Sequence, residues 1–204
     1  MEQTNLRALI ALAWEHEAEH GSFAEKLEER LSHIQRAVAL PTHEGVQALL
    51  RFVRIYIDHV PRLIDALGGA AEESGVVAQL APLVNLMEDF LLQGSGLRPD
   101  QRFLEEVLDE AYLAHRLVDS MNNLYRMMYG KDLLKLDMMS ANLIVHALIG
   151  EPFAHELDEL AEETARGLMQ GQHFETMPLM RWQSSWEHYS TLYNVHQLGV
   201  SFLR

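Results

Sequence analysis

Apolar residues recur every three or four positions along most of the chain, which is the spacing of an α-helix that buries one face. The alternation of apolar and polar residues that a half-buried strand shows is not convincing anywhere. Glycine, proline and short polar stretches separate the helical segments. The pattern therefore predicts an all-α, single-domain bundle of about six or seven helices over residues 1–204.

Turn and capping signals set the expected bounds of these helices. Gly21 separates a first helix from a second, although one long helix bent at Gly21 fits the pattern equally well. Ser22 and Glu25 have the spacing of a capping box, and Pro61 is expected to kink or split the third helix. The expected helices cover residues 5–20, 23–40, 42–67, 74–92, 100–129, 138–149 and 151–171.

The segment at about 100–129 is expected to be the long central helix of the bundle. Two apolar stripes run side by side along it, so a broad face must be buried. Glu110, His115 and Asn122 lie on this face, and Asp119 borders them. Because an unpaired buried polar group costs about 1–3 kcal/mol, these side chains need partners.

The helix expected at 138–149 repeats this polar spacing with Asn142 and His146, four residues apart. If the turn before it reverses the chain, the two helices run antiparallel and their polar side chains meet. The residues expected to converge at one level are Asp119, Asn122, Asn142 and His146. His115 and Glu151 are expected to lie a turn or more away.

Two interpretations of this polar constellation stay open. The first is a divalent metal site within the bundle that holds Fe, Mn or Zn, although no cofactor is firmly implied. Its candidate ligands are His115, Asp119, His146 and Glu151. The second is a hydrogen-bonded network, including Glu110, Asn122 and Asn142, that fixes the helix register. The network is favoured, because such networks are expected wherever a buried helix face is not wholly apolar.

Ligand spacings of helical metal-binding families are only partly present. His115-x-x-x-Asp119-x-x-Asn122 approaches the His-x-x-x-Asp-x-x-His motif of heme-oxygenase-like di-iron enzymes, with Asn in place of the last His. The upstream Glu and His of that motif are not at matching positions. The Glu-x-x-His pair of ferritin-like proteins occurs once, at Glu17 and His20. Neither motif is complete, so a metal-dependent protein or oxidative enzyme of these styles is the alternative function.

Composition removes several classes of chemistry. The chain has no Cys, which excludes disulfides, Fe–S clusters and thiolate catalysis. Its 30 acidic and 16 basic residues give a formal net charge of −14, which argues against binding a nucleic-acid backbone. The apolar stretches are shorter than the ~20 residues of a membrane span, and the N-terminus has no leader pattern. We therefore expect a cytoplasmic protein that binds neither nucleic acid nor membrane.

The acidic residues are unevenly distributed. Residues 151–175 carry seven carboxylates against Arg166 alone. The segment 180–198 is rich in Trp and Tyr, which are enriched at interfaces. The leading interpretation is a non-catalytic binding or regulatory protein that uses this acidic surface or aromatic segment on a protein partner or in a homo-oligomer. A small-molecule pocket lined by the methionines of residues 121–139 is a third interpretation.

Overall fold

The computed structural model describes residues 2–74, 77–93, 103–130, 134, 136–171 and 200–203. This part of the chain forms seven helices and one two-stranded sheet, which confirms the predicted all-α bundle. The elements are α1 (Glu2–His20), α2 (Ser22–Ile34), β1 (Val38–Ala39), α3 (Gly45–Ser74), α4 (Val77–Gln93), α5 (Leu104–Tyr129), α6 (Met139–Ile149), α7 (Phe153–Gly171) and β2 (Ser201–Phe202).

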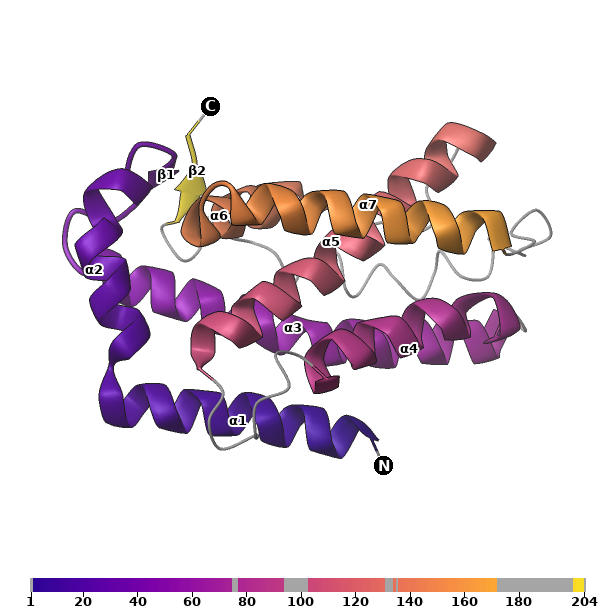
Figure 1. Ribbon diagram of the computed structural model, residues 1–204, viewed down its shortest axis with the longest axis horizontal. Coiled ribbons are helices and arrows are strands. Elements are labelled where there is room, and N and C mark those ends of the chain that lie inside the picture. Colours follow the sequence, from indigo (N-terminus) through magenta and orange to yellow (C-terminus); the bar gives the residue numbers. More distant parts are fainter. Residues whose placement is uncertain are drawn as a thin grey trace.

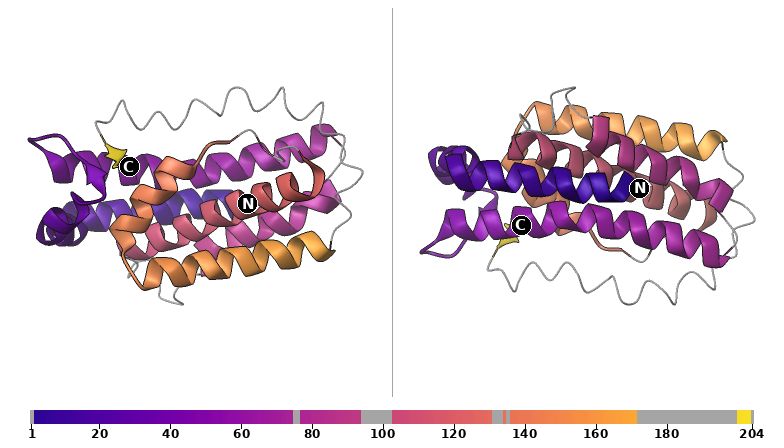
Figure 2. Two further views of the ribbon diagram at one scale, coloured as in Figure 1. Left: turned by 90° about the horizontal axis from the view of Figure 1, so that it is seen from above. Right: turned by 90° about the horizontal axis from the view of Figure 1, so that it is seen from below.

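The helices are arranged around α5. In Figure 1, α1 lies along one side of the bundle and α6 with α7 along the other, with α3, α4 and α5 between them. The two views of Figure 2 show that most of these helices follow the long axis of the molecule. α5 packs against α1, α3, α4, α6 and α7, which confirms that it is the central helix. α2 instead stands upright at one end, where it packs on α3 and α6.

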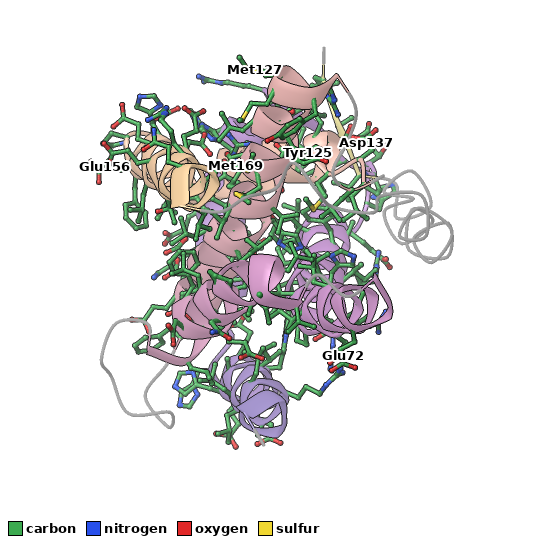
Figure 3. All side chains as sticks on the ribbon, turned by 90° about the vertical axis from the view of Figure 1, so that its right-hand side faces the viewer. Glu72, Tyr125, Met127, Asp137, Glu156 and Met169 are labelled. Carbon is green, nitrogen blue, oxygen red and sulfur yellow. The ribbon has the colours of Figure 1, made fainter. Side chains whose placement is uncertain are left out.

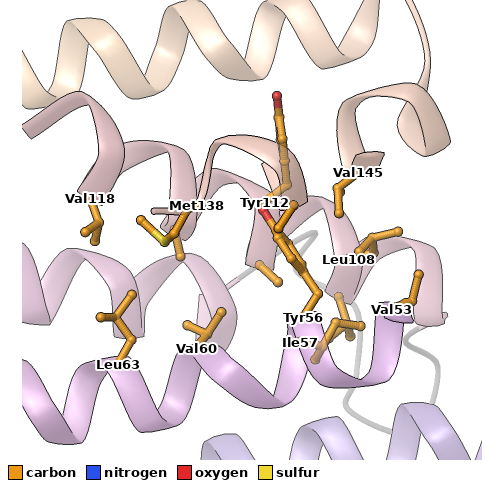
Figure 4. Packing of buried hydrophobic residues seen from close by; sticks show 14 of the residues in the cluster. Val53, Tyr56, Ile57, Val60, Leu63, Leu108, Tyr112, Val118, Met138 and Val145 are labelled. Atoms are coloured by element: carbon orange, nitrogen blue, oxygen red, sulfur yellow. The ribbon is translucent and has the colours of Figure 1, made fainter. Parts of the chain in front are cut away.

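The core forms because the apolar stripes of α3 and α5 face each other. Figure 4 shows Val60 and Leu63 of α3 opposite Val118 of α5, all of them buried. Burying a side chain of this size contributes about 1.5–3 kcal/mol. The buried apolar positions of α3 follow helical spacing throughout: Ala48, Leu49, Phe52, Val53, Tyr56, Ile57, Val60, Leu63, Ile64 and Leu67.

Residues 5–40 form two helices that meet at Gly21. Gly21 has a φ of 65°, a left-handed conformation that glycine adopts without strain. The predicted capping box of Ser22 and Glu25 is wrong, because the N-cap residue is Gly21, which has no side chain, and the Ser22 hydroxyl donates to Glu17 instead. Glu17 of α1 takes that role, and its carboxylate accepts two backbone N–H groups of the first turn of α2 at 2.8 and 2.9 Å.

Two other bounds differ from the prediction. α2 ends at Ile34 rather than near residue 40, because Val38 and Ala39 pair antiparallel with β2. The prediction that the chain has no strand is therefore wrong, and strands of two residues are too short to show alternation. α3 continues unbroken through Pro61 to Ser74 and is not split there.

The aromatic residues of 182–193 lie outside the described residues, so the expected role of this segment stays a prediction. None of the helices in the described ranges is long and apolar enough to cross a membrane.

Candidate functional site

His115 lies in the core against His59 of α3. Its Nδ1–H donates to the backbone carbonyl of Ala111 at 2.8 Å, because a carbonyl can only accept. Its Nε2 therefore accepts from Nδ1–H of His59 at 3.1 Å. Burial, with Arg62 adding to it, lowers the pKa of His59 to about 4, and burial holds the pKa of His115 well below its usual value. The pair consists of two neutral rings that hydrogen-bond in their neutral forms.

The two asparagines predicted to converge have different partners. Asn142 accepts a hydrogen bond at 2.8 Å from the hydroxyl of Tyr56, whose ring lies 4.1 Å from that of His115. The Nδ2 of Asn142 has no hydrogen-bond partner among the residues with described positions. Asn122 instead accepts from the backbone N–H of Leu134 at 2.8 Å and so fixes the connection after α5. The two amides therefore lie at different contacts, Asn142 between α6 and α3 and Asn122 at the connection after α5.

A second polar cluster links α5, α6 and α7, with Asp158 of α7 at its centre. The carboxylate of Asp158 accepts from the Tyr112 hydroxyl at 2.7 Å and from Nε of Arg116 at 2.5 Å, and it lies 3.2 Å from Nδ1 of His146. Figure 4 shows the hydroxyl of Tyr112 directed away from the core, toward α7. Burial and the adjacent Asp158 raise the pKa of Tyr112, so this hydroxyl stays a hydrogen-bond donor.

The predicted metal ligands are divided between these two clusters. Asp119 pairs with Arg116 at 2.7 Å, and Glu151 lies 2.8 Å from Nε2 of His146. His115 belongs to the core pair, and Glu110 is half-buried elsewhere on α5. Within the described ranges, no group of three or more His, Asp or Glu side chains is placed to hold a metal ion. The geometry lends the metal interpretation no support, and it stays a prediction.

A cavity of about 210 Å³ lies where α2 stands beside the first turns of α5 and the joint between α6 and α7 (Figure 1). Lys26 of α2 pairs with Glu105 of α5 across it. The cavity is lined by Phe23, Lys26, Leu27, Arg30, Glu105, Leu108, Asp109, Leu148, Ile149 and Phe153. Six of these side chains are apolar and four are charged, so the lining is more polar than that of most small-ligand pockets.

Arg30 fixes one wall of this cavity. Its Nη1 donates to the carbonyl of Leu148 at 2.9 Å, at the C-terminus of α6, where a cation is favoured by the helix dipole. Gly150 allows this approach, since a Cβ there would lie 2.5 Å from Nη2 of Arg30. Its φ of 86° also favours glycine.

Asp109 is the unusual group of the cavity. Burial, with the nearby Glu105 and Glu106 adding to it, raises the pKa of its carboxyl to about 7. Asp109 forms neither an ion pair nor a hydrogen bond with any other residue that the structure describes. A carboxyl with a strongly shifted pKa in a pocket wall is a candidate functional group.

The sequence analysis did not single out Asp109, Asp158 or His59. Asp158 lies in the acidic stretch, whose carboxylates suggested a solvated face. His59 follows Tyr56 by one helical turn on the apolar stripe of α3, and this spacing was the available signal. The sequence signal for Asp109 was weaker and consisted of several acidic residues next to an apolar stripe.

Comparison of the chain with protein-family models, with curated proteins and with solved structures found no significant match. The function is therefore argued from the geometry of the cavity and its charges.

Proposed function

We propose that this protein is a non-catalytic binding protein for a small organic cation, an amine with an apolar body, held in the cavity between α2 and α5. The observation that carries the proposal is the carboxyl of Asp109, which lines the cavity without a counter-ion among the described residues. A carboxylate in this half-buried position is less well solvated than an exposed one, and a ligand ammonium group would supply it with a partner.

The charges around Asp109 favour a cation over an anion. The ammonium of Lys26 is compensated by Glu105, and the guanidinium of Arg30 bonds to the C-terminal carbonyls of α6. An amine would form a charge-assisted hydrogen bond with the remaining carboxylate, the stronger class of hydrogen bond. The formal net charge of −14 also raises the local concentration of cations.

The walls of the cavity select the body of the ligand. Phe23, Leu27 and Leu108 are buried apolar side chains, and Phe153 forms part of the rim. Aromatic faces attract cations and pack against apolar groups. A cavity of about 210 Å³ limits the ligand to a small molecule. Short aliphatic and single-ring amines meet all of these conditions.

Binding should depend on pH, because the ligand competes with the proton on Asp109. The free carboxyl, with a pKa of about 7, is protonated below that pH and cannot then form an ion pair. Affinity should rise as the pH approaches 7 and then level off. Between pH 5 and pH 8 we expect a change of about 100-fold.

Calorimetric titration with phenethylamine at pH 8 and pH 5 tests this proposal. Asp109→Asn should abolish saturable binding, since the amide keeps the size of the side chain but cannot carry the charge. Glu28→Gln is the matched control, because it removes one carboxylate from an exposed position of α2 that does not line the cavity. The absence of saturable binding at both pH values, or wild-type affinity in Asp109→Asn, would refute the proposal.

The expected protein partner or homo-oligomer, and the expected cytoplasmic location, stay predictions beside this one. The acidic face of α7 supports a basic partner by its charge alone.

A further inference from the structure

A second cavity, of about 380 Å³, lies farther along α5 toward its C-terminus, between α5 and α7. Figure 3 views this end of the molecule, with Met127 of α5 and Met169 of α7 labelled. Its lining residues are Arg116, Ser120, Asn123, Leu124, Met127, Glu162 and Arg166. It does not share a lining residue with the cavity of Asp109.

Arg116 enters this cavity in a fixed orientation. Its Nε is bonded to Asp158 and its Nη1 to Asp119. A guanidinium has five N–H donors, so the Nη2 group is left to bind a ligand. The two aspartates that hold Arg116 also compensate its charge.

The charges of the cavity that are not compensated belong to two side chains of α7. Glu162 and Arg166 lie one helical turn apart, both are exposed, and neither has an ion pair within the described residues. The cavity therefore offers one free cation and one free anion. Its complement is a ligand that carries both charges, whereas a simple anion would face Glu162 and a simple cation would face Arg166.

Two side chains that line the cavity are apolar. Leu124 and Met127 lie on one face of α5, and 83% of Met127 is exposed, so it is free to contact a ligand. Methionine adapts its shape to ligands of different form. Ser120 and Asn123 add hydrogen-bonding groups to the lining.

We infer that this second cavity binds a free α-amino acid with an apolar side chain. Its carboxylate bonds to Arg166 and to Nη2 of Arg116, its ammonium pairs with Glu162, and its side chain packs on Leu124 and Met127. This inference does not depend on the function proposed for the cavity of Asp109. Because the groups are exposed, the affinity is weak, with a Kd of about 1 mM.

The experiment is a titration of ¹⁵N-labelled protein with L-leucine, L-leucinamide and N-acetyl-L-leucine, followed by amide chemical shifts. Leucinamide lacks the carboxylate, and N-acetylleucine lacks the ammonium. We expect saturable shifts in α5 and α7 for leucine, and binding at least about tenfold weaker for each analogue. Equal affinity for the three compounds, or no shifts there up to about 20 mM leucine, would overturn the inference.

Single substitutions test the contribution of each charged side chain separately. Arg166→Gln should weaken leucine about tenfold and leave leucinamide unchanged, while Glu162→Gln should weaken leucine and leave N-acetylleucine unchanged. Glu163→Gln is the matched control, at an exposed position of the same helix that does not line the cavity. Asp109→Asn should not alter leucine binding. If it does, leucine occupies the other cavity and the inference is wrong.

Discussion

The His59–His115 pair and Asp109 are both ionisable groups that burial drives toward their neutral forms, yet they have opposite roles. The histidines donate and accept between themselves and to Ala111, so three of their four ring nitrogens form hydrogen bonds inside the core in the neutral state. Asp109 faces a cavity and has no partner in the described part of the chain. A shifted pKa therefore does not by itself identify a site. A candidate site is identified instead by hydrogen-bonding capacity that remains unused.

The two regions should also respond to pH in opposite directions. The folded pKa of His59, about 4, is below its unfolded value of 6.5, so the unfolded state binds more protons and stability is lost as the pH falls. The folded pKa of Asp109, about 7, is above its unfolded value of 3.8, so stability is lost as the pH rises. Each group can be tested by a substitution that removes its side chain and leaves the other group intact.

The largest effect should come from the core pair. His115→Ala removes a fully buried ring, leaves a cavity and deprives Nδ1–H of His59 of its acceptor. We expect a loss of about 3 kcal/mol or more in the free energy of unfolding, measured with urea at pH 7.5. His155→Ala is the control, because that side chain is exposed on α7, and its change should stay within about 0.5 kcal/mol. A loss below about 1 kcal/mol in His115→Ala would show that the pair does not stabilise the core.

The second largest effect should be the change in the free energy of unfolding with pH. Protonation of the unfolded state at His59 alone should contribute a loss of about 2 kcal/mol between pH 7.5 and pH 5.0. Asp109 opposes this loss over the same range, so Asp109→Asn should make the decline with acid steeper. Urea unfolding at several pH values measures both slopes. A slope that is unchanged in Asp109→Asn would contradict the raised pKa of that carboxyl.

The smallest effect should be an increase in stability caused by Asp109→Asn. At pH 8 the carboxylate of Asp109 is ionised in a half-buried position, and Asp109→Asn removes that cost while it abolishes amine binding. We expect an increase of about 1 kcal/mol in the free energy of unfolding, since binding groups are often held at the expense of stability. Glu28→Gln should leave stability within about 0.5 kcal/mol of the wild type. A destabilised Asp109→Asn would mean that the carboxyl is structural.

The features that depend on one helix could be predicted from the sequence, and those that depend on how helices meet could not. The two apolar stripes of α5 predicted its central position and the burial of His115. The partner of His115 could not be predicted, because His59 is 56 residues away and meets it only through the register of α3 against α5. Asp158 was missed because the acidic stretch of α7 suggested full solvation, although one of its carboxylates turns inward to Tyr112.

The cavity of Asp109 was missed for a similar reason, since it exists only because α2 stands upright beside α5. The capping of α2 followed the same principle. Ser22 and Glu25 have the spacing of a local cap, but the left-handed turn at Gly21 brings Glu17 to the backbone N–H groups first. Local sequence signals fail where a neighbouring helix offers a better partner.

Arg30 and Gly150 shape one wall of the cavity, and they are separate from Asp109, the group that gives the cavity its charge. The guanidinium extends from α2 to the last carbonyls of α6, and glycine at position 150 leaves room for it. The width of the pocket and the charge it recognises are thus encoded at separate positions. If the cavity binds an amine as proposed, substitutions at the arginine or the glycine should change the size of ligand it accepts and leave the preference for a cation, which rests on Asp109, unchanged.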